Sequence, residues 1–172
     1  MKKLKKTAQK NLILKSAELI INDRDHEVFN EDINKVARKI VGDILYLDPP
    51  YNQRQYATNY HLLETIAKYD NPKIHGRTGL REYQNQKSLY CSRTQVKKTF
   101  KDLISKVKVK YIFLSYNNEG LMTLDDIKEI MSLRGKYGYF TKEYNRFKAD
   151  KSENRNYTAN KTMEYLHYGI CN

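Results

Sequence analysis

The sequence predicts an α/β domain with a largely parallel sheet. Short apolar runs at residues 44–47 and 111–115 have the length and composition of strands that are buried on both faces of such a sheet. Segments with apolar residues at helical spacing alternate with these strands, which is the pattern of α/β domains. The chain of 172 residues shows no internal repeat or linker. We therefore expect residues 1–172 to form one domain.

The first part of the chain is expected to hold a short strand at residues 27–29. The apolar residues of the segment 31–40 share one helical face and predict a helix there. Asn30 is a suitable N-cap for this helix. Gly42 ends that helix, and the buried strand at residues 44–47 follows.

The central part is expected to contain a helix at residues 59–69, a long polar loop at residues 70–92 and a second helix at residues 93–107. The second helix carries a stripe of apolar residues expected to be buried, and the strand at residues 111–115 follows this helix. The members of this stripe are Val96, Phe100, Leu103, Ile104 and Val107.

The last part begins with a helix over residues 123–133, capped by Thr123. Residues 139–147 and 163–170 alternate as strands and suggest a hairpin, which would make the sheet edge mixed. Ligands of such sheets bind beyond the carboxyl ends of the strands. Asp48 and residues 115–117 would emerge there.

Charge points to a polyanionic partner. Lys and Arg outnumber Asp and Glu by 32 to 20, which gives a formal net charge of +12. Such a charge attracts nucleic acid, and fifteen tyrosines offer flat faces for bases. Charge by itself does not distinguish a specific nucleic-acid binder from a merely basic protein.

The composition also argues against several classes. No apolar run approaches the roughly 18 residues that a membrane span needs, and the basic start is not followed by a secretory apolar segment. The two cysteines, Cys91 and Cys171, lie far apart without metal-ligand spacing. We therefore expect no membrane partner, no metal and a reducing, cytoplasmic location.

The sequence Asp48-Pro49-Pro50-Tyr51 directly follows the strand at residues 44–47. An adenine amino group is a poor nucleophile because its lone pair is delocalised into the ring. A carboxylate can accept one amino hydrogen, and a carbonyl held outward by the rigid Pro-Pro step can accept the other. Tyr51 can then stack on the base. A tetrapeptide could also simply end a strand in a turn, but a carboxylate at the end of a buried strand is costly unless it is used.

Several longer segments resemble the Dam-like adenine-specific DNA methyltransferases that accompany type II restriction systems. The matching segments are residues 43–56, 59–67, 78–81, 113–121 and 161–166. The resemblance spans roughly residues 25–170. It implies a Rossmann-like methyltransferase fold, S-adenosylmethionine as the cofactor, and methylation of N6 of an adenine flipped out of double-stranded DNA.

The resemblance also assigns site residues. Asp48, Pro49, Pro50 and Tyr51 are expected to be catalytic, and Asp32, Ile33 and Asp48 to bind the cofactor. Asp32 could equally be an acidic residue that stabilises the first turn of a helix.

Basic and aromatic residues beyond the Asp-Pro-Pro-Tyr sequence are the candidates for DNA contact. Tyr56 and Tyr60 could line the base pocket or touch a displaced strand, although Tyr60 could instead fill the core. The loop from Lys73 to Arg93 is rich in basic residues and suits phosphate contacts, although a solvated loop is the alternative. The full set of expected DNA-binding residues is Arg54, Tyr56, Tyr60, Arg77, Arg81 and Arg93.

The chain departs from the family at its start. The Gly-rich loop that approaches the methionine part of the cofactor is not found, and the first glycine is Gly42. We therefore expect an N-terminally incomplete fold: a fragment, a truncated reading frame, or half of a split enzyme completed by a second chain. One competing hypothesis is an inactive nucleic-acid-binding remnant. The other is methylation of the amino group of cytosine, but Asp rather than Ser at position 48 favours adenine.

From these patterns we predict that the 172-residue chain alone binds S-adenosylmethionine poorly but binds DNA in a salt-sensitive, weakly specific manner. Each phosphate contact should steepen the log–log salt dependence by roughly 0.9. Calorimetry with the cofactor and DNA titrations at several salt concentrations test both parts. Micromolar cofactor binding would contradict the first part, and salt-independent DNA binding the second.

Overall fold

The computed structural model describes Gln9, Ile13, residues 15–145 and residues 161–172. The chain divides into two units, residues 1–30 and residues 31–172. In the first unit, residues 15–30 form neither helix nor strand, so the strand expected at residues 27–29 is absent. Val28 is 95% exposed, and no described strand pairs with this segment to satisfy its backbone.

The second unit begins with helix α2, Ile33–Val36, which is shorter than the helix expected over residues 31–40. Its cap is Asp32 rather than Asn30, because the Asp32 carboxylate accepts the Lys35 amide at 3.3 Å. The residues after the Ala37 C-cap continue as turns and not as helix.

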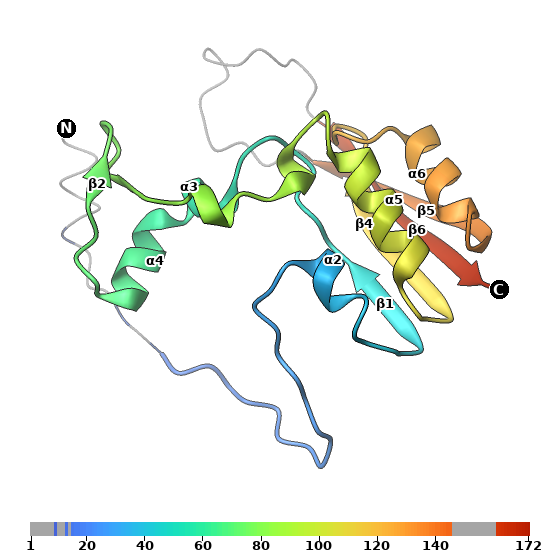
Figure 1. The fold of residues 1–172 in the computed structure, drawn as a ribbon, viewed down its shortest axis with the longest axis horizontal. Coiled ribbons are helices and arrows are strands. Elements are labelled where there is room, and N and C mark those ends of the chain that lie inside the picture. Colours follow the sequence, from blue (N-terminus) through green and yellow to red (C-terminus); the bar gives the residue numbers. More distant parts are fainter. Residues whose placement is uncertain (1–8, 10–12, 14, 146–160) are drawn as a thin grey trace. The chain divides into compact units, whose positions relative to one another are not determined.

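A four-stranded mixed sheet follows, ordered β1-β4-β6-β5 (Figure 1). Its strands are β1 Ile44–Leu47, β4 Tyr111–Asn117, β5 Gly135–Asn145 and β6 Lys161–Cys171. Strand β1 pairs with β4 in parallel, whereas β6 is antiparallel to both β4 and β5. One of the three pairings is thus parallel, which does not confirm a mostly parallel sheet. Strands β1, β4 and β5 nevertheless share one direction.

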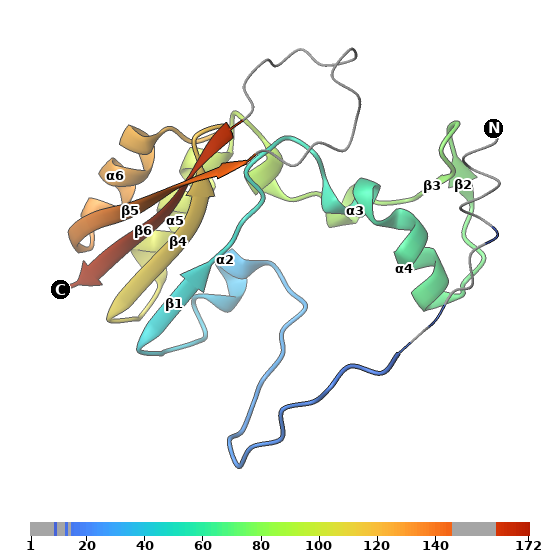
Figure 2. The same ribbon diagram turned by 180° about the vertical axis from the view of Figure 1, so that it is seen from behind.

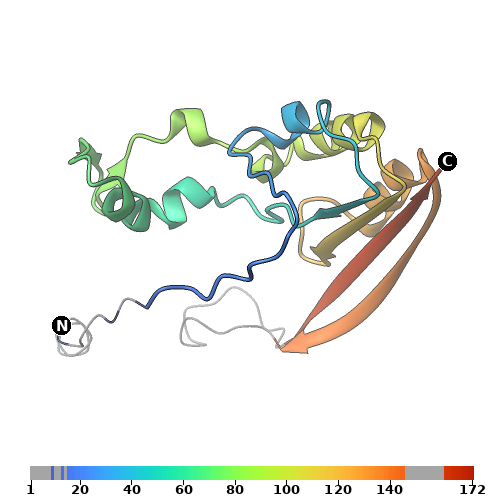
Figure 3. The same cartoon turned by 90° about the horizontal axis from the view of Figure 1, so that it is seen from below.

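The late strands confirm the expected hairpin and mixed edge. Strands β5 and β6 pair along their whole length, from Gly135 opposite Cys171 to Asn145 opposite Lys161 (Figure 3). The expected end of the first strand, Phe147, lies outside the described residues.

Two helices, α5 Val96–Lys106 and α6 Leu124–Ser132, cover one face of the sheet and enclose the core (Figure 1). The expected apolar stripe is confirmed: four of its members lie on α5 and Val107 is the C-cap, and each of the five is no more than 2% exposed. Thr123 caps α6 as expected: its hydroxyl accepts the Asp126 amide, and the Asp126 carboxylate accepts the Thr123 amide.

The opposite face of the sheet is bare in the described chain (Figure 2). Leu47 is buried toward the helices, whereas Ile44 and Tyr46 are 63% and 61% exposed. The expectation that β1 is buried on both faces is therefore wrong. The reason is that β1 is an edge strand of a sheet that carries described helices on one face only.

Between β1 and α5 the chain makes a long excursion over residues 52–92. Its elements are α3 Tyr56–Asn59, α4 His61–Lys68, β2 Ile74–His75, β3 Leu80–Arg81, and the 3₁₀ helices η1 Gln84–Gln86 and η2 Leu89–Cys91. The expected helix at residues 59–69 corresponds to α4, with the separate short helix α3 before it, and the expected polar loop contains a small hairpin. No described helix is both long and apolar enough to cross a membrane.

Asn34 joins three elements in a polar cluster. Its amide donates to the Thr99 carbonyl and to Asp102, both at 2.9 Å, and its oxygen accepts the Tyr90 hydroxyl at 2.9 Å. Helix α2 is thereby attached to α5 and to η2. Hydrogen bonds from Lys106, the larger effect, and from Asn34 lower the pKa of Asp102 to about 2.

We predict that Asp102 makes stability depend on pH at the acid end. Its folded pKa lies below the unfolded value of about 3.9, so its contribution is present above pH 4 and is lost as pH falls toward 2. Asp102→Asn should therefore flatten the dependence of the urea midpoint on pH between 4 and 2. Glu129→Gln, which alters an exposed carboxylate on α6, is the control. An unchanged pH profile for Asp102→Asn would contradict the assignment.

Candidate active site

The site begins where β1 ends. The parallel register places Leu47, the last residue of β1, opposite Leu114. Asp48 therefore leaves β1 alongside the carboxyl-terminal part of β4, which still contains Ser115 and extends to Asn117. Asp48 is exposed, and its carboxylate accepts no hydrogen bond from a described residue. The topology therefore presents a carboxylate to ligands, as expected from the strand order.

A buried tyrosine hydroxyl holds the loop beside this turn. Tyr116 is 2% exposed, and its hydroxyl accepts the amides of Leu121 and Met122 at 3.1 and 3.3 Å. The Leu121 amide also donates to the carbonyl of Tyr51 at 3.0 Å. The Asp-Pro-Pro-Tyr turn is thus tied to the end of β4 through one loop.

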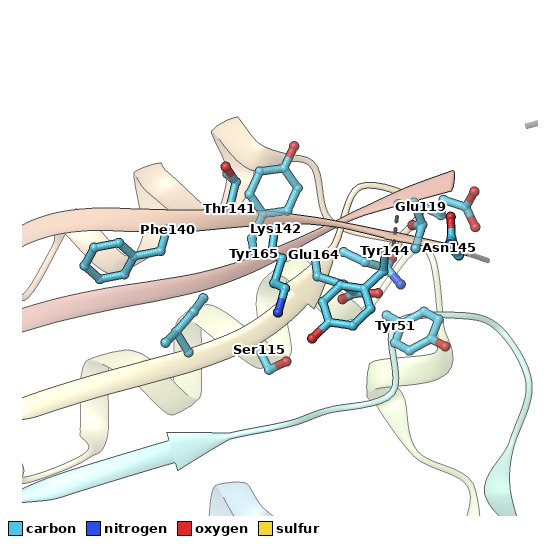
Figure 4. A pocket seen from close by; sticks show the side chains of 13 residues that line it. Tyr51, Ser115, Glu119, Phe140, Thr141, Lys142, Tyr144, Asn145, Glu164 and Tyr165 are labelled. Carbon is cyan, nitrogen blue, oxygen red and sulfur yellow. Dashed lines mark hydrogen bonds between the residues drawn. The ribbon is translucent and has the colours of Figure 1, made fainter. Parts of the chain in front are cut away.

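A pocket of about 880 Å³ opens next to Tyr51 on the bare face of the sheet. The Tyr51 ring enters it from the β1 side and the Tyr144 ring from the β5 side (Figure 4). Its described lining is Tyr51, Ser115, Asn117, Glu119, Phe140, Thr141, Lys142, Tyr144, Asn145, Thr162, Glu164, Tyr165 and Leu166.

The pocket combines aromatic rings with charged groups of both signs. Lys142 lies opposite Glu164 in the strand register, and its ammonium sits 5.1 Å from the centre of the Tyr144 ring. Flat rings with nearby hydrogen-bonding groups suit a planar, polar ligand such as a nucleobase. Among the described residues no cluster of three His, Cys, Asp or Glu side chains could hold a metal ion.

The hairpin residues of this pocket were missed from the sequence, although a signal existed. Phe140, Lys142, Glu164 and Leu166 alternate along two strands that were expected to pair, so they share one face once the register is known. The register could not be read from the chain, because the connection between the two strands is long and polar.

The residues expected to bind the cofactor lie on and before α2. Asp32 is exposed and uses one carboxylate oxygen on the Lys35 amide. Ile33 is half-buried and packs against the core.

The residues expected to bind DNA fall into two groups. Arg54, Arg77 and Arg93 are exposed and make no ion pair with a described carboxylate, and Tyr56 and Tyr60 are more than half exposed. The side chain of Arg81 is only 10% exposed. Its guanidinium donates to both carboxylate oxygens of Asp70 and to the Thr65 hydroxyl, so it attaches β3 to α4.

A carboxylate-Pro-Pro-aromatic segment at the carboxyl end of a strand, beside a pocket lined by aromatic rings and polar groups, is the arrangement expected of the amino-methylating class of DNA methyltransferases. Residues 1–130 match the profile of the D12 class N6 adenine-specific DNA methyltransferases, and the chain belongs to that family. This confirms the resemblance to adenine-specific DNA methyltransferases.

Several curated relatives are similar over nearly the whole chain. It is 53% identical to type II methyltransferase M.NlaIII of Neisseria lactamica over 97% of its length, and 41% identical to type II methyltransferase M.FokI of Planomicrobium okeanokoites over 95%. It is also 35% identical to type II methyltransferase M.CviAII of Paramecium bursaria Chlorella virus 1 over 98%. The chain spans 49%, 25% and 49% of these relatives' lengths. No solved structure matches it significantly.

We predict that Gly120→Ala disturbs the loop that holds Tyr51. A Cβ at Gly120 would lie 2.1 Å from the buried Tyr116 ring, so the two must shift apart, and we expect this to weaken the hydrogen bonds of the Tyr116 hydroxyl. Overpacking of this kind costs roughly 1–3 kcal/mol. Urea unfolding measures it. Gly42→Ala is the matched control, because nothing lies within 4 Å of its added Cβ. Equal stability of the two variants would be inconsistent with this role for Tyr116.

Proposed function

We propose that this chain is the catalytic part of a type II restriction–modification methyltransferase, which transfers a methyl group to N6 of an adenine flipped out of double-stranded DNA. The observation that carries the proposal is the Asp-Pro-Pro-Tyr turn at the end of β1, next to a pocket that Tyr51 and Tyr144 line. The similarity to type II methyltransferases over nearly the whole chain supports it.

In this scheme the turn prepares the amino group for attack. Asp48 accepts one amino hydrogen and the carbonyl at Pro49 accepts the other, so electron density is retained on the nitrogen. Tyr51 stacks on the flipped base from one side of the pocket, and Tyr144 is placed to contact it from the other. Stacking worth roughly 1–3 kcal/mol per base offsets part of the cost of extrusion.

S-adenosylmethionine would supply the methyl group. We propose that Asp48, Asp32 and Ile33 contribute to its binding. Asp48 accepts no hydrogen bond from a described residue, and Asp32 has a second carboxylate oxygen available to a ligand. Both carboxylates are exposed, which fits a cofactor that carries hydroxyl and amino donors.

The finer fold and a second chain belong to the same proposal. Three strands of one direction with the reversed β6 between β4 and β5 support a Rossmann-like methyltransferase fold. The bare sheet face and the free edge of β1 support a further polypeptide segment that covers them, since open edges and apolar faces are normally protected. An inactive remnant is the alternative. We also propose a cytoplasmic location, supported by the free thiols Cys91 and Cys171.

Fewer arginines are proposed to contact DNA than were expected from the sequence. Arg54, Arg77 and Arg93 are available to phosphates because they are exposed and make no described ion pair. Arg81 is reassigned to a structural role because both of its terminal nitrogens bind Asp70.

We predict that Asp48→Ala lowers methyl transfer by roughly 10²–10³-fold or more in a complete enzyme containing this chain, while DNA binding changes little. Tyr51→Ala should weaken activity strongly and Tyr51→Phe much less, because the ring face matters more than the hydroxyl. Mass analysis of methylated nucleosides measures the rate and separates methyladenine from methylcytosine.

The matched control is Asp43→Ala, which removes an exposed carboxylate at the other end of β1. Turnover of Asp48→Ala within tenfold of the unaltered enzyme would refute the catalytic assignment. Equal losses in the two Tyr51 variants would assign a role to the hydroxyl instead. Detection of methylcytosine instead of methyladenine would show that the substrate base is cytosine.

A further inference from the structure

Two aromatic rings have no role in the scheme above: that of Tyr56, the first residue of α3, and that of Tyr60, the residue that caps its end. Tyr56 and Tyr60 lie one helical turn apart, with ring centres 5.7 Å apart in an edge-to-face arrangement. They are 55% and 56% exposed. Neither lines the pocket that Tyr51 and Tyr144 share. Two large rings therefore face solvent just outside the site.

Helix α3 is held firmly at the base of the excursion. The Gln55 side-chain amide donates to the Ser88 carbonyl at 3.2 Å, and the Ser88 amide donates back to the Gln55 side chain at 2.8 Å. The Cys91 thiol donates to the Arg54 carbonyl, and the Thr58 hydroxyl donates to the Gln55 carbonyl. The aromatic pair therefore stands on a fixed support.

This support lies next to the catalytic turn. Tyr56 follows Tyr51 by five residues. Burial, and then the nearby Asp48 carboxylate, raise the pKa of the Tyr56 hydroxyl, which places the ring within electrostatic range of that carboxylate. Arg54 is exposed beside the pair and makes no ion pair with a described residue.

A base that leaves the helix for the pocket leaves a gap in the stack and a partner base without its pair. Flat side chains can fill such gaps, and proteins that distort DNA often insert apolar wedges between bases. The net charge of +12 attracts the DNA phosphates, and Arg54, two residues before Tyr56, could bind those on either side of the gap.

We propose that Tyr56 and Tyr60 form a wedge that enters the duplex where the target adenine leaves and stacks on the orphaned base. This inference rests on the proposed function, because it needs a flipped base. The wedge stabilises the flipped state and takes no part in the transfer itself, so Tyr56 and Tyr60 are positioning residues.

The test measures flipping on a duplex that the enzyme methylates, with fluorescent 2-aminopurine in place of the target adenine. The unaltered enzyme should raise the fluorescence as the base unstacks. Tyr56→Ala and Tyr60→Ala should each lower the flipping equilibrium constant roughly tenfold or more. The Phe variants should retain flipping. Tyr69→Ala, which removes a 94% exposed tyrosine of the same excursion, is the matched control and should change nothing.

A second duplex, with an abasic site opposite the target, has no orphaned base to stabilise. The Ala variants should regain the unaltered enzyme's signal on it, an effect that a merely structural role of the rings would not produce. Flipping by the Ala variants equal to that of the unaltered enzyme on the paired duplex would overturn the wedge. Loss on both duplexes, or loss in the folded Phe variants, would do the same. No fluorescence rise with the unaltered enzyme on either duplex would overturn the proposed function itself.

Discussion

The parallel pairing of β1 with β4 is the constraint on which the rest of the site depends. Because Leu47 lies opposite Leu114, the turn after β1 and the end of β4 meet at one edge of the sheet. A shift of one residue in this register would send Leu47 to the bare face and rotate Asp48 away from Ser115. Burial of Leu47 and Leu114 under α5 and α6 therefore determines where the carboxylate stands.

The same register explains why the loop after β4 matters to a turn that precedes it by some seventy residues. Tyr116 is buried because it belongs to the covered face, and its hydroxyl reaches the amides of a loop that has no ladder partner of its own. One of those amides also binds the Tyr51 carbonyl. Core packing and active-site geometry are therefore connected through a single side chain.

Sequence patterns predicted those elements whose stability comes from local periodicity. The stripe of α5 and the cap at Thr123 are formed as expected, because both depend on neighbours within a few residues. The exposed face of β1 could not be predicted, since an unbroken apolar run does not reveal how many faces are covered. The lining of the pocket by β5 and β6 needed a register that only long-range pairing sets. The DNA contact expected of Arg81 stays a prediction, and its pairing with Asp70, eleven residues earlier, could not be predicted from composition.

The two hydrogen bonds between Gln55 and Ser88 close the excursion into a loop. Its two ends are joined where they leave and rejoin the chain beside the catalytic turn, so changes in length or composition between them need not move Asp48 or β4. Such a closed insertion can diverge rapidly while the chemistry stays fixed. Substitutions within the excursion can therefore change the surface that it presents to solvent without moving the carboxylate at the end of β1.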